Sequence, residues 1–170
     1  YLSRPKRLAL SEFGPQNIIY NNGGKFRINR MQILSEVIPH KFFYNPKTGV
    51  VYKDEENTTH HTDIITGESF DGVAKLIPGM CIEAQDMVAA ETEKITCQEE
   101  ERSRKYYKTK TYFASDDPRA ISECELKSPH GELLANIRYS PSCRLTYILE
   151  SRNDDNANGF AFDTKTGDWI

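Results

Sequence analysis

Apolar and polar residues alternate over residues 143–150, and this period of two constrains the fold more than any other feature of the chain. The segment CRLTYILE places Cys, Leu, Tyr and Leu at every second position, and residues 133–139 repeat the pattern. Alternation of this kind is typical of a half-buried strand, whose successive side chains point to opposite faces. Residues 121–127 are joined to them through the turn sequence SPHG at 128–131, so we predict a three-stranded antiparallel meander.

Turn signals divide the first half of the chain into further short strands. Residues 7–13 and 17–20 flank a Gly-Pro pair, and residues 25–31 follow an Asn-Gly-Gly corner, which predicts a β-meander. Residues 40–54 place NPKTG between two aromatic and β-branched runs, where proline fixes φ and glycine permits a positive φ. This segment is predicted to form a hairpin. PKTG returns as TKTG at residues 164–167, which we interpret as a reused turn rather than an internal repeat.

Helical signals gather at residues 96–107. A T-x-x-E capping box opens this segment, and three consecutive glutamates fill the first turn, where the helix dipole favours negative charge. Glutamates four residues before Arg104 and Lys105 add favourable pairs. These features predict a short helix. For residues 83–94 the sequence leaves helix and extended strand open.

The predicted fold class is therefore α+β, mostly antiparallel β-sheet built from meanders and hairpins, with one or two short helices. Residues 1–170 form one domain or two subdomains, a β-rich part at 1–78 and a helix with an antiparallel meander at 79–170. Residues 159–163 supply another short strand. The polar runs at 55–63 and 151–158 are predicted to be loops.

The charge composition limits any nucleic-acid site to a local patch. The net charge is -3 and the pI is about 5.9, whereas coating a nucleic acid or an anionic membrane needs many lysines and arginines. No apolar run approaches the roughly 18 residues of a membrane span, and no apolar leader is present. The four cysteines are widely spaced without a C-x-x-C pair, which favours reduced thiols in a cytoplasmic protein.

No catalytic motif is evident in the sequence. It has no phosphate-binding loop, nucleophile elbow or metalloprotease motif, and its carboxylates lack a spacing that indicates acid–base catalysis. His60 and His61 are adjacent in a polar segment, where neighbouring side chains point in opposite directions, so a solvated loop is favoured over a metal site. We therefore expect no enzymatic activity, no metal and no cofactor.

A basic, tyrosine-rich stretch, RSRKYYKTKTY at residues 102–112, indicates one local binding site. Cations that contact phosphates and aromatic rings that stack on bases are what single-stranded nucleic acids require. A second basic cluster lies close to the start of the chain. The candidate nucleic-acid-binding residues are Arg102, Arg104, Lys105, Tyr107, Lys108, Lys110, Arg4, Lys6 and Arg7. A capped, dipole-compensated surface helix explains part of the same pattern without any ligand.

Three segments resemble a known family, in the same order along the chain. They are SRPKRLALSEFGPQNIIYNNGGKFRI at residues 3–28, TCQEEERSRKYYKTKTYF at 96–113 and GFAFDTKTGDW at 159–169. They are similar to segments downstream of the motor in large bacterial DEAD/DEAH-box (superfamily 2) helicases of the phage-defence and DNA-repair type. The resemblance implies an accessory region that works beside ATPase lobes lying outside these residues.

One difference limits what the resemblance implies. Members of that family commonly carry C-x-x-C pairs between the first and second of these segments, where this chain has a hairpin sequence instead. Zinc binding is therefore not implied for this chain. The resemblance also assigns no role to individual residues.

Two functions of different classes follow as expectations. In the first, the chain is a non-catalytic accessory domain of a DNA helicase-like protein, which helps to engage DNA or RNA or docks the motor lobes to a partner subunit, in anti-phage defence or DNA repair. In the second, it is a protein-interaction or scaffolding module without nucleic-acid contact, because strands rich in Tyr and Phe supply interface anchors. A continuous basic stripe favours the first function, and an exposed apolar patch rimmed by polar groups favours the second.

Overall fold

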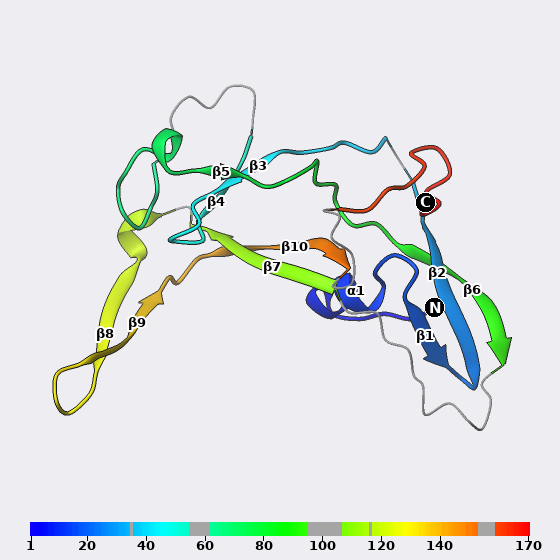
Figure 1. Ribbon diagram of the computed structural model, residues 1–170, viewed down its shortest axis with the longest axis horizontal. Helices are drawn as coiled ribbons and strands as arrows, with labels where there is room; N and C mark the ends of the chain where they lie inside the picture. Colours follow the sequence, from blue (N-terminus) through cyan, green and yellow to red (C-terminus); the bar gives the residue numbers. More distant parts are fainter. Residues whose placement is uncertain (35, 55–61, 95–106, 116, 153–158) are drawn as a thin grey trace. The chain divides into compact units, whose positions relative to one another are not determined.

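The computed structural model describes residues 1–34, 36–54, 62–94, 107–115, 117–152 and 159–170 (Figure 1). They form mostly antiparallel β-sheet with one α-helix, which confirms the predicted fold class. The helical elements are α1 (Lys6–Glu12), η1 (Phe70–Gly72) and η2 (Pro118–Ala120). The strands are β1 (Ile18–Asn21), β2 (Gly24–Met31), β3 (Phe42–Tyr44), β4 (Val51–Lys53), β5 (Lys75–Leu76), β6 (Met87–Lys94), β7 (Tyr107–Ala114), β8 (Ser122–Lys127), β9 (Leu133–Tyr139) and β10 (Arg144–Arg152).

The chain divides into two compact units, each assembled from separate segments. Unit 1 comprises Tyr1–His40, Pro78–Lys110 and Tyr147–Ile170, and unit 2 comprises Lys41–Ile77 and Thr111–Thr146. The paired strands β7 and β10 each begin in one unit and end in the other. This division differs from the single boundary between residues 78 and 79 that the sequence suggested.

Unit 1 is built on a three-stranded sheet with the strand order β1-β2-β6. A two-residue turn joins β1 to β2 at the predicted corner, where Asn22 and Gly23 both have positive φ, of 48° and 75°. Such a turn matches the right-handed twist of the flanking strands, and asparagine and glycine tolerate its backbone best. Ile28 and Met31 of β2 are buried, with exposed fractions of 2% and 1%, and centre the core of this unit.

Strand β6 settles the question that the sequence left open for residues 83–94. It pairs antiparallel with β2, with Met31 opposite Met87 and Phe26 opposite Glu91. Ala and Glu favour a helix in isolation, but the hydrogen bonds and side-chain contacts along an available strand edge outweigh that preference.

The expectation of a strand at residues 7–13 was wrong, because the chain forms α1 there. Pro5 precedes the helix with φ of -53°, and its carbonyl accepts hydrogen bonds from the N–H groups of Leu8 and Ala9, both 2.9 Å long. Proline at the start of a helix has a φ that suits the helix. Its missing N–H costs no hydrogen bond, because the first N–H groups of a helix have no partner within it. Arg4 and Glu12 then close an ion pair of 2.9 Å along the exposed side.

The predicted three-stranded meander was also wrong in its pairing. β8 and β9 pair antiparallel as expected, but β10 pairs with β7 instead of β9. Alternation identifies a strand without identifying its neighbour. The choice follows burial, because β7 contributes the buried Tyr112, and β10 is half-buried or buried from residue 146 onward.

Residues 159–163 do not form the separate strand that was expected. Phe162 instead makes an isolated bridge with Trp169, and Trp169 donates its N–H to the carbonyl of Asn29 in β2. The C-terminal hairpin thus lies along β2. The predicted helix at residues 96–107 falls outside the described residues, except for Tyr107, which begins β7.

One turn occurs three times within the described ranges, and the sequence showed only two of these copies. The copies are Asn45–Val50, Asp63–Glu68 and Asp163–Asp168. In each, the side-chain oxygen of the first residue accepts a backbone N–H from two positions ahead, and a glycine at the fifth position has a φ between 71° and 80°. That glycine donates its N–H to the carbonyl of the first residue. The middle copy, DIITGE, shares little more than Thr-Gly with the others, so it is hard to recognise from the sequence.

The first two copies of this turn are joined through a buried carboxylate. Asp63 is 0% exposed, and its Oδ2 accepts hydrogen bonds of 2.6 Å from Asn45 Nδ2 and from Thr48 Oγ1. Its Oδ1 accepts the N–H groups of Ile65 and Thr66 at 2.8 Å and 3.1 Å. Burial alone would raise the pKa of Asp63, but these hydrogen bonds stabilise the carboxylate and lower its pKa below the ordinary value.

The turn glycines provide a matched test of close packing. A Cβ at Gly167 would collide with the carbonyl oxygen of Met31, whereas a Cβ at Gly67, the same position of the middle copy, meets nothing within 4 Å. We expect Gly167→Ala to lower the free energy of unfolding by roughly 2–4 kcal/mol and Gly67→Ala by about 1 kcal/mol, the cost of positive φ alone. Urea unfolding followed by circular dichroism measures both. Equal losses would contradict the close approach of the C-terminal hairpin to β2.

The buried carboxylate gives a second matched pair. Removing Asp63 leaves Asn45 and Thr48 without their acceptor, so Asp63→Ala should lower the free energy of unfolding by about 2–4 kcal/mol. Asp163→Ala, at the same position of the exposed copy, should lower it less. Because the folded-state pKa of Asp63 lies below its unfolded value, its stabilisation is complete above about pH 4 and is lost as the pH falls further. The free energy of unfolding of Asp63→Asn should therefore lack the pH dependence that comes from protonation of Asp63. A pH profile equal to that of the wild type would refute the lowered pKa of Asp63.

Candidate interaction surface on the β8–β9 ribbon

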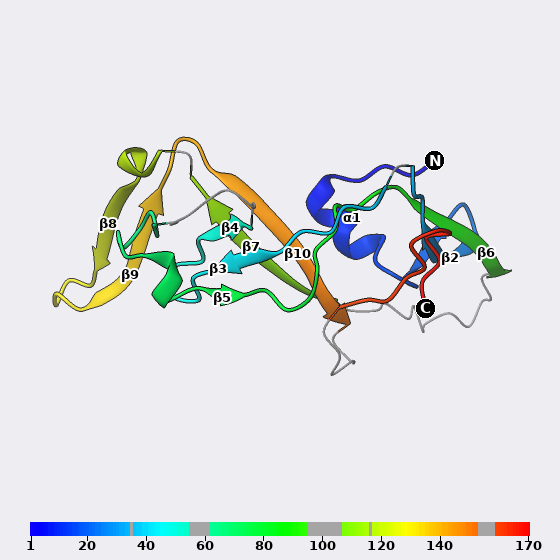
Figure 2. The same ribbon diagram turned by 90° about the horizontal axis from the view of Figure 1, so that it is seen from above.

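The most exposed regular structure in unit 2 is the pair β8 and β9, which we call the ribbon. Every residue of both strands is exposed. Figures 1 and 2 show the two strands running side by side to a connecting turn. In that turn, Ser128 donates its N–H to the Glu132 carbonyl at 2.8 Å, and Gly131 adopts a φ of 84°. Among the described residues, β8 and β9 pair only with each other.

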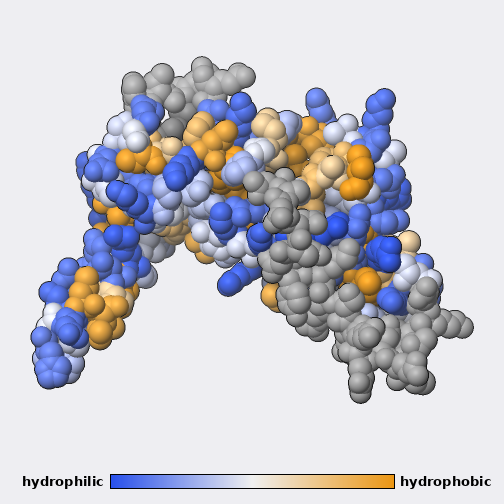
Figure 3. Space-filling view, viewed as in Figure 1, coloured by the Kyte–Doolittle hydropathy of each residue, from blue (hydrophilic) through white to orange (hydrophobic). Residues whose placement is uncertain are grey.

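The register of the ribbon separates its side chains into two different faces. Residues directly opposite each other in an antiparallel pair lie on the same face, and alternate residues of one strand share a face. One face contains no charged side chain, and Figure 3 shows a hydrophobic patch on the ribbon. We call this the apolar face, and in the regular part of the register, before the shift that pairs Lys127 with Leu133, its residues are Ser122, Cys124, Leu126, Ala135, Ile137 and Tyr139.

The opposite, polar face carries charges that neutralise one another. Arg138 Nη2 lies 3.0 Å from Glu123 Oε1, directly across the two strands. Lys127 Nζ lies 2.8 Å from Glu125 Oε2 on the same strand. Exposed pairs of this kind contribute little stability, at most about 1 kcal/mol each. They do leave the polar face without a dominant charge of either sign.

The large side chains of the apolar face are about half exposed. The exposed fractions are 50% for Leu126, 52% for Ile137 and 65% for Tyr139. A two-stranded ribbon is marginally stable in water unless its apolar face packs against something. Covering these side chains would gain about 25 cal/mol for each Å² of apolar area removed from water. The apolar face of the ribbon is therefore suited to packing against the surface of another molecule.

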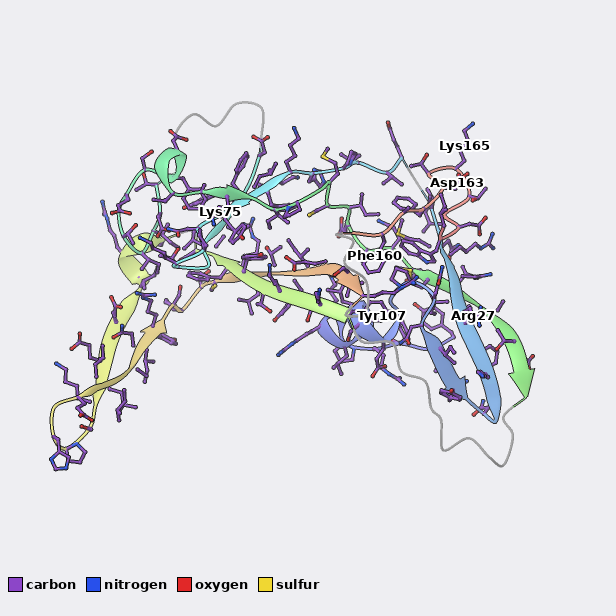
Figure 4. The ribbon with its side chains drawn as sticks, in the orientation of Figure 1. Arg27, Lys75, Tyr107, Phe160, Asp163 and Lys165 are labelled. Carbon is purple, nitrogen blue, oxygen red and sulfur yellow. The ribbon has the colours of Figure 1, made fainter. Side chains whose placement is uncertain are left out.

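The basic stretch predicted as a nucleic-acid site is only partly described. Arg102, Arg104 and Lys105 lie outside the described residues. Tyr107, the next candidate, is half-buried rather than displayed: its hydroxyl donates a hydrogen bond of 2.9 Å to the Pro15 carbonyl. Its ring packs over Gly14, and its ring centre lies 6.1 Å from that of Phe160. Figure 4 labels Tyr107 and Phe160, which lie close together.

The other predicted cations make contacts within unit 1. Lys110 Nζ lies 2.9 Å from Glu150 Oε1 on the neighbouring strand β10. Arg4 pairs with Glu12, as described above, and the guanidinium carbon of Arg7 lies 5.9 Å from the ring centre of Tyr147. The structure brings Arg4, Lys6 and Arg7 together around the start of α1.

Lys6 and Lys108 are exposed, Lys6 on α1 and Lys108 on β7. The structure gives no ion pair for either side chain within the described ranges. Of the predicted cations that are described, these two are the most available to a ligand. Among the described residues, one exposed lysine without an ion pair on each of these two elements does not make a continuous basic stripe.

Other kinds of site find no support in the part of the chain that the structure describes. No group of three or more His, Cys, Asp or Glu side chains there is placed to hold a metal ion. No helix there is long and apolar enough to cross a membrane. The pKa of the Cys81 thiol is raised by burial and by the nearby Glu150 carboxylate, which makes the thiol less reactive.

Sequence reasoning missed the ribbon as a surface because alternation predicts strands that are half-buried. The alternation of Leu133, Ala135, Ile137 and Tyr139 with other residues indicates two different faces, but nothing local shows whether either face is covered. One available signal of an uncovered strand was the low apolar content of residues 121–127, where Leu126 is the only large aliphatic residue after Ile121. A strand with so little to bury rarely occupies the centre of a core.

Comparison with known proteins adds no relative. No family model matches the chain, and neither the curated proteins nor the solved structures give a match.

The role of Tyr107 can be separated from nucleic-acid stacking by stability measurements. Tyr107→Phe removes the hydrogen bond to Pro15 and should lower the free energy of unfolding by about 1 kcal/mol. Tyr107→Ala also removes the ring from Gly14 and Phe160 and should lower it by roughly 3–5 kcal/mol. Lys108→Ala, one residue further on the exposed side, should change it by less than about 0.5 kcal/mol. A Tyr107→Ala variant as stable as Lys108→Ala would contradict the structural role.

Proposed function

We propose that this chain is a non-catalytic interaction module that docks onto a protein surface through the apolar face of the ribbon. The observation that carries the proposal is a paired, regular β-structure that presents three large, half-exposed side chains on one face and no charge beside them. Exposed apolar patches rimmed by polar groups mark protein interaction sites. The centre of such interfaces is depleted in charge and enriched in aromatic residues, which Tyr139 supplies here.

The charges of the described residues favour a protein over a nucleic acid as the ligand. Nucleic-acid affinity depends on cations that neutralise phosphates and on exposed rings that stack on bases. The apolar face offers no cation, and on the polar face both cations are already paired with glutamates. In unit 1, Lys110 and Arg4 are likewise paired, and the ring of Tyr107 is engaged with the chain itself.

The family resemblance is consistent with docking and suggests a setting for it. An accessory region of a superfamily 2 helicase has motor lobes beside it, and these lobes or a partner subunit would supply a surface to dock against. Engagement of DNA or RNA through the basic stretch at residues 102–110 is the runner-up, supported by the exposure of Lys108. Roles in anti-phage defence or DNA repair belong to this same proposed setting.

Two neighbouring positions on β9 allow a matched test of docking. Ile137 and Asn136 point to opposite faces, and lysine at either position places one new charge on an exposed strand. A photo-crosslinking amino acid at 137, introduced into the chain in its native cell, should give one discrete protein adduct, and the same group at 136 should not. The crosslinked protein, purified, should bind the unmodified chain directly. Ile137→Lys should weaken this binding at least tenfold, and Asn136→Lys should change it less than about twofold.

Three outcomes of this test would overturn docking through the apolar face. They are equal adducts at 136 and 137, no adduct at either position, and binding that Ile137→Lys leaves intact. A parallel titration of labelled single- and double-stranded DNA and RNA across a salt series examines the runner-up. Salt-sensitive binding that persists in Ile137→Lys but falls in Lys108→Ala, without a protein adduct, would replace docking by nucleic-acid engagement.

A further inference from the structure

We infer that the surface docked on the apolar face is the same face of a second copy of this chain. This inference rests on the proposed docking function and names its partner. Two features carry it: the volumes of the side chains along the register, and the distribution of charge. The consequence is a weak, symmetric dimer in which two ribbons pack face to face.

Each cross-strand pair on the apolar face combines one small and one large side chain. Ser122 lies opposite Tyr139, and Cys124 lies opposite Ile137. In the third pair the order is reversed, because the large Leu126 of β8 lies opposite the small Ala135 of β9. None of these three pairs contains two large side chains. In each pair, the small side chain therefore leaves a depression in the face next to the protruding large side chain.

A twofold axis parallel to the strands makes this face complementary to itself. Two sheets that pack face to face lie about 10 Å apart, with their strands nearly aligned. Rotation about such an axis places β8 of one copy over β9 of the other at the same level along the strands. Tyr139 then faces Ser122 of the second copy, and Ile137 faces its Cys124. At the third level Leu126 faces the second copy's Ala135, so a large side chain meets a small one throughout, which is the condition for interdigitation.

The distribution of charge allows two identical apolar faces to pair. A twofold interface brings identical surfaces together, and any charge on the face would meet its own sign across the axis. The apolar face carries none. The charged side chains lie on the opposite face, where Glu123 and Arg138, and Glu125 and Lys127, already form pairs. A second copy therefore meets no repulsion and needs no oppositely charged partner.

The size of the face predicts that the dimer is weak. A fully buried Leu or Ile side chain corresponds to about 60–120 Å² of apolar area. Because the large side chains of the apolar face are about half exposed, the six side chains together bury on the order of 150–250 Å² per copy. Stable interfaces bury about 800 Å² per partner, and smaller ones are typical of transient contacts. We expect a reversible dimer with a dissociation constant on the order of 10–1,000 μM.

Sedimentation equilibrium of the full chain under reducing conditions, from about 10 μM to 1 mM, measures this association. The wild-type chain should show a reversible equilibrium between monomer and dimer. Ile137→Lys should abolish it, since the introduced charges would be buried opposite apolar groups, and Asn136→Lys should leave it within about twofold. Unfolding transitions of both variants verify that each remains folded.

A volume exchange distinguishes a second copy from any other apolar partner. Ala135→Leu places a leucine over Leu126 of the second copy, and Leu126→Ala leaves a gap there, so each single variant should weaken dimerisation roughly tenfold. The double variant Leu126→Ala/Ala135→Leu restores one large and one small side chain at that level. Its association should return to within about threefold of the wild type, because its interaction energy is strongly non-additive. A double variant no better than the worse single variant would overturn the self-docking arrangement.

The remaining outcomes separate this inference from the proposed function. A chain that stays monomeric at 1 mM but gives a discrete adduct with a different protein at position 137 contradicts the second copy and leaves docking intact. A chain that is monomeric and gives no adduct contradicts both. A dimer that Ile137→Lys does not disturb uses another surface, and open-ended association instead of a dimer contradicts the twofold arrangement.

Discussion

The hydrogen bonds from backbone N–H groups to the side-chain oxygen that opens each recurrent turn are the interaction on which most of the fold depends. In the first copy they close the hairpin of β3 and β4 at Asn45, and in the second they hold the buried carboxylate of Asp63 beneath it. In the third they bend the C-terminal hairpin so that the Gly167 carbonyl accepts a hydrogen bond from the N–H of Met31. A local rule of turn chemistry thus fixes contacts between segments far apart in the sequence.

The ribbon is held together in a different way, and this difference is the basis of its proposed function. Its turn is secured by Ser128 and Gly131, and its strands by the ladder and the exposed pair of Glu123 and Arg138. None of these contacts removes the apolar face from water. Apolar residues of other strands, such as Ile28 of β2 and Val51 of β4, are covered, with exposed fractions of 2% and 3%. The ribbon can therefore form without its apolar face being covered, and we propose that another chain covers this face.

Local chemistry was predictable from the sequence, and long-range pairing was not. The Asn22-Gly23 turn and the NPKTG hairpin were recognised because the required backbone conformations restrict the residue types. The alternation around Leu145 located β10 correctly but pointed to the wrong neighbour, since a period of two contains no information about the partner strand. The helix α1 was mistaken for a strand because only seven residues, KRLALSE, give too short a window for a helical period.

The candidate site was predictable to a smaller extent than the fold. Tyr107 and Lys110 satisfied the composition of a nucleic-acid site, and sequence alone could not show that Pro15 and Glu150 engage them. The residues of the apolar face were all located on predicted strands. Their exposure could not be foreseen, because a local sequence pattern does not show whether another element packs over that face.

The most direct test of the account is amide hydrogen exchange in β8 and β9 as a function of chain concentration. An uncovered two-stranded ribbon opens readily, so its amides should exchange fast in dilute solution compared with those of β2, whose two neighbours β1 and β6 are in place. Raising the concentration toward 1 mM should slow exchange at Ile137 and its neighbours in the wild type and leave Ile137→Lys unchanged. The account would be contradicted if ribbon amides exchanged as slowly as those of β2 at low concentration and if their exchange did not depend on concentration. The apolar face would then need no second chain to cover it.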